Sequence, residues 1–298
     1  MSQALTVTTR PDGVAVLTFD QPGSKANVLT RELWTEFGEA LASIAARTDL
    51  RQGGGVGGHP GGVPPVKGLV LASAKPGIFI AGADLNLLQN APGPNDPDVR
   101  AFIDLGLRVL EQLEALPFPT CAAIDGAALG GGLEVALACD VRIAGTNPKV
   151  QLGLPEVKLG LIPGWGGSQR LPRLIGLSEA SEMVVSGHAD EADTCLGNGL
   201  VARVVASNRL IEEACAAVRG AGAARAKKFA PLSATDREST IAAGSNSTAA
   251  REAIRVMELG AGLPLAAAIK LETEAFLRLT GSDESKRLIA AFFASRKK

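Results

Sequence analysis

Hydrophobic and polar positions alternate at the start of the chain, and the alternation breaks once. Residues 4–20, ALTVTTRPDGVAVLTFD, alternate on both sides of the turn sequence at 11–13. Two alternating runs joined by such a turn predict a β-hairpin. In residues 29–47 the apolar positions instead recur at helical spacing: Leu33, Phe37, Leu41 and Ile44. This spacing predicts a helix, and Thr30 is suited to cap it.

Strand and helix patterns continue to alternate through the middle of the chain. The helical spacing of residues 96–116 predicts a long amphipathic helix. Short apolar runs predict strands at 68–73, 119–126, 141–145 and 150–156. The recurring order of strand, strand and helix indicates a mixed α/β layered fold and not eight regular β/α units.

Strand patterns stop near residue 211, and the rest of the chain has helical periodicity. Helices are expected at 211–228, 247–260, 264–280 and 283–298, with Ser282 or Asp283 as the cap of the last one. We therefore divide the chain into an α/β core, 1–210, and a C-terminal helical section, 211–298. Glycine and proline dominate residues 51–65, which predicts a mobile surface loop, and we assign no role to His59 within it.

The composition of the chain excludes several classes of function. The chain has 298 residues, 46% of them hydrophobic, and a formal net charge of -1. The chain therefore lacks the overall positive charge that would indicate nucleic acid or an acidic membrane as a partner. With no membrane-spanning run and no leader pattern at the start, we expect a cytoplasmic protein. The scattered cysteines, Cys121, Cys139, Cys195 and Cys215, indicate reduced core residues, and no metal site is expected.

Several common catalytic motifs are missing from the sequence. It contains no dinucleotide fingerprint after a strand, no phosphate-binding P-loop, no nucleophile elbow and no tyrosine. Carboxylates and backbone amides are thus the groups on which any chemistry here depends.

Two glutamates stand in segments that are otherwise apolar or glycine-rich. Glu134 lies within GAALGGGLEVALACD, residues 126–140, and Glu156 within VQLGLPEVKLG, residues 150–160. A shared site would push their pKa values apart and divide acid and base roles between them. Each also has a structural interpretation, Glu134 as an acid favoured by a helix dipole and Glu156 as an acceptor for loop amides.

Glycine-rich segments supply backbone amides near these acids. Residues 130–132 stand at a predicted strand-to-helix junction, where amides without partners favour negative charge. The segment FIAGADL, residues 79–85, ends a second predicted strand in small residues. Amides from both segments, converging on one oxygen, would form an oxyanion hole. The alternative for Ala81, Gly82 and Ala83 is a plain tight turn.

Three blocks together carry a family resemblance. FIAGADL, IDGAALGGGLEVALACDVRIA and LGLPEVKLGLIPGWGGSQRLPRLIG resemble the signature segments of the crotonase (enoyl-CoA hydratase/isomerase) superfamily. The early segment PGSKANVLTRELWTEF and the C-terminal helices are similar to those of the bifunctional α-subunits of fatty-acid β-oxidation complexes. The resemblance implies the crotonase (ClpP-like) spiral of strand-strand-helix units. Trp165 departs from it, standing where the family usually has a small residue.

Position by position, the resemblance implies four catalytic roles. The amides of Ala83 and Gly131 would bind the thioester oxygen, Glu134 would orient water as general base, and Glu156 would protonate the α-carbon. Binding of the coenzyme A thioester would involve five further positions: Lys25, Ala26, Ala81, Gly82 and Gly130. Coenzyme A is part of the substrate, so no separate cofactor is expected.

The resulting hypothesis is a 2-enoyl-CoA hydratase of fatty-acid β-oxidation, a lyase. Two alternatives stay open: a Δ3,Δ2-enoyl-CoA isomerase, in which Glu156 alone moves the proton, and a non-catalytic hydratase-like binding subunit. The expected partners are an enoyl-CoA substrate and either copies of the chain, as a trimer or hexamer, or a thiolase or dehydrogenase subunit. The apolar tail is expected to cover the acyl pocket of its own core or to dock on a neighbouring subunit.

Overall fold

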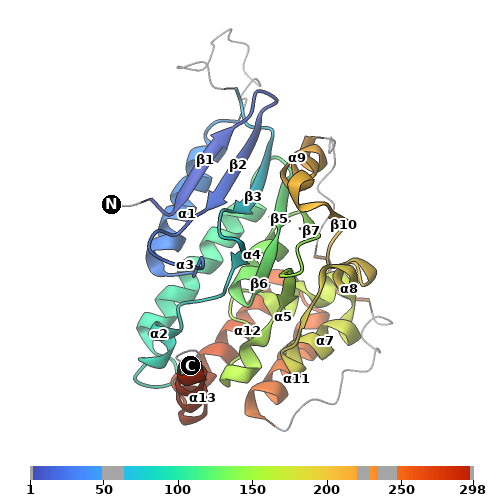
Figure 1. The fold of residues 1–298 in the computed structure, drawn as a ribbon. Coiled ribbons are helices and arrows are strands. Elements are labelled where there is room, and N and C mark those ends of the chain that lie inside the picture. The colour runs from blue at the N-terminus through green and yellow to red at the C-terminus, as the bar shows by residue number, and fades with distance from the viewer. Residues whose placement is uncertain (1–2, 49–63, 220–228, 234–246, 296–298) are drawn as a thin grey trace.

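Two sheets and a set of surrounding helices make up the computed structural model (Figure 1), which describes residues 3–48, 64–219, 229–233 and 247–295. Over this part of the chain the larger sheet has the order β1 (Leu5–Thr9), β2 (Val14–Phe19), β3 (Gly68–Ser73), β5 (Thr120–Ile124), β7 (Val141–Gly145) and β10 (Arg203–Val205). β1 and β2 form the predicted antiparallel hairpin, and the other neighbours are parallel.

The smaller sheet holds the strand ends that point toward the predicted site. Its order is β4 (Gly77–Ile80), β6 (Gly126–Leu129), β8 (Gln151–Gly153) and β9 (Ala189–Asp190). The first three strands are parallel, so their carboxyl ends lie along one edge. The segments 81–85, 130–134 and 154–156 leave the sheet at that edge, which brings both predicted amide sites and both predicted glutamates together.

Helices surround the sheets on several sides. Those before residue 140 are α1 (Arg31–Ala45), α2 (Leu85–Gln89), α3 (Pro97–Glu114) and α4 (Gly131–Ala138). They are followed by the 3-10 turn η1 (Pro155–Leu159), α5 (Gly167–Arg170), α6 (Pro172–Ile175), α7 (Leu177–Ser186), α8 (Ala192–Gly197) and the turn η2 (Ser207–Arg209). The C-terminal helices are α9 (Leu210–Arg219), α11 (Thr248–Ala261), α12 (Leu265–Leu279) and α13 (Asp283–Ser295).

Capping side chains fix the starts of several helices. The Thr30 hydroxyl accepts a hydrogen bond from the Leu33 amide at 3.2 Å, which confirms the predicted cap of α1. Asp96 caps α3 in the same way, directly before Pro97. For α13 the sequence left two candidates, and the structure selects Ser282, whose hydroxyl accepts from the Ser285 amide.

Two apolar clusters lie on opposite faces of the larger sheet. Helix α9 covers one face, where Leu210, Cys215 and Val218 pack on the strands. Burial of such a face is the main favourable contribution to folding. The other face belongs to a larger core shared with α1, α3 and α4. All four cysteines are free thiols buried in the interior, as expected.

The last helices lie against the core of their own chain, one of the two arrangements left open by the sequence. α12 packs on α11 and α5, and α13 packs on α2 and η1 (Figure 1). The division at residue 210 stays a prediction. His59, most of the 51–65 loop and residues 220–228 of the predicted 211–228 helix lie outside the described residues.

A fully buried asparagine connects the segments that lead into the site. The Asn27 amide nitrogen donates to the Phe79 carbonyl at 3.0 Å and to the Ser73 hydroxyl at 2.9 Å, and its oxygen accepts from the Gln21 amide. Residues 27–29 continue beside 81–84, with a parallel bridge between Leu29 and Ala83. Asn27 therefore holds the strand-to-helix junction after β4 in place.

Replacing Asn27 with alanine should leave these buried partners unsatisfied. We expect Asn27→Ala to lower the free energy of unfolding by about 3 kcal/mol, measured by chemical denaturation. Asn208→Ala, at an exposed position, is the matched control and should change stability by less than about 0.5 kcal/mol. Equal stability of the two variants would contradict this role of Asn27.

Candidate active site

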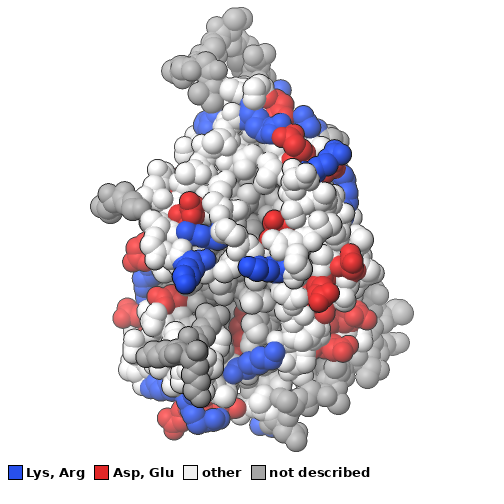
Figure 2. All heavy atoms as spheres, in the orientation of Figure 1, with Lys and Arg blue, Asp and Glu red and all other residues white. Residues whose placement is uncertain are grey.

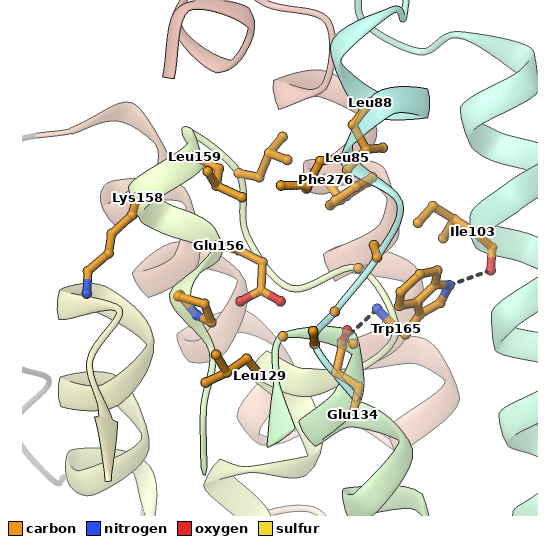
Figure 3. Close-up of a pocket in the computed structure, with 18 of the residues that line it drawn as sticks. Leu85, Leu88, Ile103, Leu129, Glu134, Glu156, Lys158, Leu159, Trp165 and Phe276 are labelled. Carbon is orange, nitrogen blue, oxygen red and sulfur yellow. Dashed lines mark hydrogen bonds between the residues drawn. The ribbon is translucent and has the colours of Figure 1, made fainter. Parts of the chain in front are cut away.

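An apolar cavity of about 180 Å³ lies at the carboxyl edge of the smaller sheet. Its apolar lining comes from α2, α3, η1, α12 and α13 and includes Leu85, Leu88, Phe102, Ile103, Leu159, Phe276 and Phe292. Glu134 and Glu156 line the same cavity, and their carboxylates point into one part of it (Figure 3). An apolar cavity with a few convergent polar groups is typical of a small-molecule site.

Two backbone amides without acceptors face this region. Ala83 follows β4, and Gly131 is the first residue of α4; both line the cavity. Among the hydrogen bonds of the described residues, neither amide has an acceptor. Gly82 has φ +108° and Gly130 has φ +53°, values that favour glycine directly before each amide. The predicted pair of amide sites is thus brought together at one cavity.

Glu134 lies in the first turn of α4 and is 1% exposed. Its Oε1 accepts hydrogen bonds from the amides of Trp165 and Gly167, each at 2.7 Å. Burial raises the pKa of this carboxyl to about 7, while the two amides oppose the shift because they favour the charged form. A carboxyl of this kind can exchange a proton near neutral pH.

Glu156 is held differently, although it borders the same space. It belongs to η1, and a Cβ at position 130 would lie 2.8 Å from its Oε1, so a side chain there would displace this carboxylate. Its Oε2 is buried and has no hydrogen-bond partner among the described residues. Burial, followed by the charge of Glu134, raises the pKa of Glu156 well above its usual range.

Trp165, the departure from the family pattern, forms one wall of the cavity. Its ring nitrogen donates to the Ile103 carbonyl at 3.1 Å, and the ring packs edge-on against Trp34 and Phe102. A Cβ at Gly131 would lie 2.6 Å from the ring. Trp165 therefore shapes the cavity beside a predicted oxyanion donor, and its backbone amide binds Glu134.

A third buried carboxylate was missed in the sequence. Glu272 of α12 is 0% exposed and accepts from the amides of Gly166 and Ser168 and from the Ser168 hydroxyl. Burial, followed by the charge of Glu134, raises its pKa to about 8. A signal was present in the sequence, because Glu272 stands at helical spacing between Ala268 and Phe276 and so falls on the buried face.

The remaining predicted positions divide into two groups. Ala81, Gly82 and Gly130 line the cavity. Lys25 is exposed and Ala26 half-buried; neither lines the cavity, although both directly precede the segment that pairs with residues 81–84.

The charged side chains that the structure describes on one face of the molecule form no patch of a single sign (Figure 2). Positive and negative side chains are interspersed over the face shown in Figure 2. Over the described residues no cluster of three potential metal ligands occurs, and no helix there is long and apolar enough to cross a membrane.

Comparison with known proteins agrees with this geometry. Residues 62–240 match the enoyl-CoA hydratase/isomerase family. A fatty acid oxidation complex subunit alpha of Shewanella halifaxensis is 41% identical over 72% of this chain. The match covers 28% of that relative, so the chain corresponds to a small part of its length.

Solved structures extend the match to almost the whole chain. An enoyl-CoA hydratase of Geobacillus kaustophilus is 31% identical with a TM-score of 0.62, covering 99% of this chain and 95% of the other. An enoyl-CoA hydratase of Bacillus anthracis is 29% identical with a TM-score of 0.62, covering 98% and 97%. The architecture is the crotonase fold, as expected. The chain belongs to the enoyl-CoA hydratase/isomerase family.

The buried state of Glu134 has a consequence for stability. The pKa of Glu134 is about 7 in the folded protein and has the usual value of 4.5 in the unfolded chain. Between pH 4.5 and pH 7, Glu134 is therefore protonated in the folded state and ionised in the unfolded state. Stability is therefore lost as pH rises through this window. We expect Glu134→Gln, which keeps an oxygen for both amides, to melt at a higher temperature than the unaltered protein at about pH 8 and at the same temperature at about pH 4 to 5.

Thermal melting across this pH range measures the difference. Glu179→Gln, in the exposed first turn of α7, is the control and should melt like the unaltered protein throughout. A Glu134→Gln protein that melts lower at about pH 8 would contradict the expectation.

Proposed function

We propose that the protein is a 2-enoyl-CoA hydratase that adds water across the double bond of trans-2-enoyl-CoA thioesters. The observation that carries the proposal is the different environment of two glutamates at one cavity. Two amides stabilise the charged form of Glu134, whereas no donor does so for Oε2 of Glu156. Such an asymmetry pushes two pKa values apart and assigns a base and an acid.

The amides of Ala83 and Gly131 serve as the oxyanion hole in this proposal. Both border the cavity and have no acceptor within the described part of the chain. Negative charge that develops on the thioester oxygen would be stabilised by these fixed donors without rearrangement of the protein. Loss of one donor of this kind typically costs about 10²- to 10³-fold in rate.

The reaction then proceeds with Glu134 as base and Glu156 as acid. The Glu134 carboxylate takes a proton from water, and the water oxygen forms a bond to C3 of the substrate. The electron pair of the double bond moves toward the thioester, and an enolate oxygen forms at the two amides. When the carbonyl is restored, C2 takes the proton from Glu156. One water is consumed, and a proton passing from Glu134 to Glu156 resets both residues.

The relative that is a fatty acid oxidation complex subunit supports a wider role in this proposal. We place the hydration in fatty-acid β-oxidation, where a 3-hydroxyacyl-CoA dehydrogenase uses the product. Association with a dehydrogenase or thiolase subunit, or with further copies of this chain, belongs to the proposal. Coenzyme A enters as part of the substrate, and Lys25 and Ala26 are assigned to its binding in this proposal.

Isosteric substitutions of the two glutamates test the assignment. We expect Glu134→Gln and Glu156→Gln each to lower kcat for hydration of crotonyl-CoA by about 10²- to 10⁴-fold, because each loses a positioned acid–base group. The loss of absorbance of the conjugated thioester measures turnover, and Glu179→Gln is the matched control.

Three outcomes separate the alternatives. Turnover like that of the unaltered protein in either variant would contradict the assigned roles. Conversion of a 3-enoyl-CoA that needs Glu156 but not Glu134, without hydration, would indicate an isomerase. No change in any acyl-CoA would indicate a binding subunit.

The apolar end of the cavity leads to a prediction about the length of the substrate's acyl chain. Figure 3 shows Leu85, Leu88, Leu159 and Phe276 grouped there, and Phe292 of α13 lines the same cavity. We expect Phe292→Ala to lower kcat/KM for a ten-carbon enoyl-CoA by about tenfold, roughly 1.4 kcal/mol, and to change crotonyl-CoA turnover less.

Phe293→Ala provides the matched control on the same helix. Phe293 is also half-buried but does not line the cavity, so it should not alter the ratio between long and short substrates. An equal loss for both chain lengths in the Phe292 variant would show that α13 acts on assembly or stability instead.

A further inference from the structure

Four successive backbone amides are bound alternately by two buried carboxylates. The amides of Trp165 and Gly167 donate to Glu134 at 2.7 Å each. The amides of Gly166 and Ser168 donate to Glu272 at 2.5 and 2.8 Å. Alternate amides point to opposite sides of this segment, so the two carboxylates hold residues 165–168 from both sides.

The third donor to Glu272 is a side chain of the same segment. The Ser168 hydroxyl donates to Glu272 Oε2 at 2.5 Å and itself accepts from the Gln169 side-chain amide at 3.0 Å. Both oxygens of Glu272 are therefore occupied by donors from a segment more than a hundred residues away in the sequence. None of these contacts involves the cavity, which Glu272 does not line.

Burial of a carboxylate lowers the stability of the folded state unless hydrogen bonds compensate it. An apolar residue at this position of α12 would pack without that cost. The neighbouring position shows the contrast. Thr273 is also buried on α12, yet its hydroxyl has no hydrogen-bond partner among the described residues. Three hydrogen bonds distinguish Glu272 from such a position and give it a specific effect on one loop.

We propose that Glu272 is a positioning residue for the catalytic base: it fixes the 165–168 segment, which in turn fixes the orientation of Glu134. The inference rests on the proposed function of Glu134. Glu272 contacts no part of the predicted substrate site, and its effect reaches the chemistry through the amides of Trp165 and Gly167. Helix α12 of the C-terminal section thereby supports, through Glu272, a site built at the edge of the smaller sheet.

The test compares Glu272→Gln with Thr273→Val in the full-length chain, using crotonyl-CoA. Glutamine has one acceptor oxygen in place of two, so the 165–168 segment loses part of its support. We expect kcat to fall by about 10- to 100-fold, the effect of a small misplacement of a catalytic group, with KM within about twofold. Thr273→Val should leave both parameters unchanged.

A double variant separates positioning from general stability. Because Glu272 acts through Glu134, adding Glu272→Gln to Glu134→Gln should lower the residual turnover little further. A general structural role would give independent losses that multiply. If Glu272→Gln does not fold, Ser168→Ala removes one donor and leaves the carboxylate, and should lower kcat in the same direction by a smaller factor.

Hydrogen exchange gives a readout independent of turnover. Amides of residues 165–168 should exchange faster in Glu272→Gln than in Thr273→Val, with the remaining core unchanged. Loss of turnover in Glu134→Gln but not in Glu272→Gln or Ser168→Ala would overturn this inference alone. Full turnover in Glu134→Gln would overturn the proposed function. If the unaltered protein does not hydrate crotonyl-CoA, hydrogen exchange still tests the inference. Equal exchange of the 165–168 amides in Glu272→Gln and in the unaltered protein would show that Glu272 does not support this segment.

Discussion

Three carboxylates lie close together in this protein, two of them fully buried and the third half-buried, and the interior solvates their charge poorly. Backbone amides of residues 165–168 compensate Glu134 and Glu272, and the buried Arg170 stabilises the charge of both. Arg170 is itself held by Glu114 and by the Trp165 carbonyl. The cavity, the loop beside it and the docking of α12 all depend on this set of hydrogen bonds.

The same compensation is incomplete for Glu156, and this difference separates the two carboxyls in their affinity for a proton. A carboxyl with an unpartnered buried oxygen holds a proton more readily than one bound by two amides. If both carboxyls accepted the same number of hydrogen bonds, their proton affinities would be similar and neither would be favoured as acid or base. Stability and chemistry are therefore opposed here, because each further donor to Glu156 would stabilise its charged form, lower its pKa and leave less of the carboxyl protonated near neutral pH.

Much of this architecture could be predicted from local patterns. The hairpin, the Thr30 cap and the glycine junction before α4 depend on neighbours close in sequence, whereas the joint site of Glu134 and Glu156 was expected from the family resemblance. Glu272 could not be identified in this way, since helical spacing gives its face but not the amides that face it. Trp165 was recognised as unusual, yet its fit against Gly131, Trp34 and Phe102 depends on three distant segments.

The bond between Gly166 and Glu272 spans 106 positions of the chain. The loop-closure entropy of such a contact must be paid before the contact itself contributes stability. The strands β4, β6 and β8 and helix α4 lie within residues 77–153, but the segment that binds Glu134 acquires its full support only when α12 docks. During refolding, local secondary structure should therefore return before the hydrogen bonds between residues 166–168 and Glu272 form, and only then is the segment that orients Glu134 held from both sides.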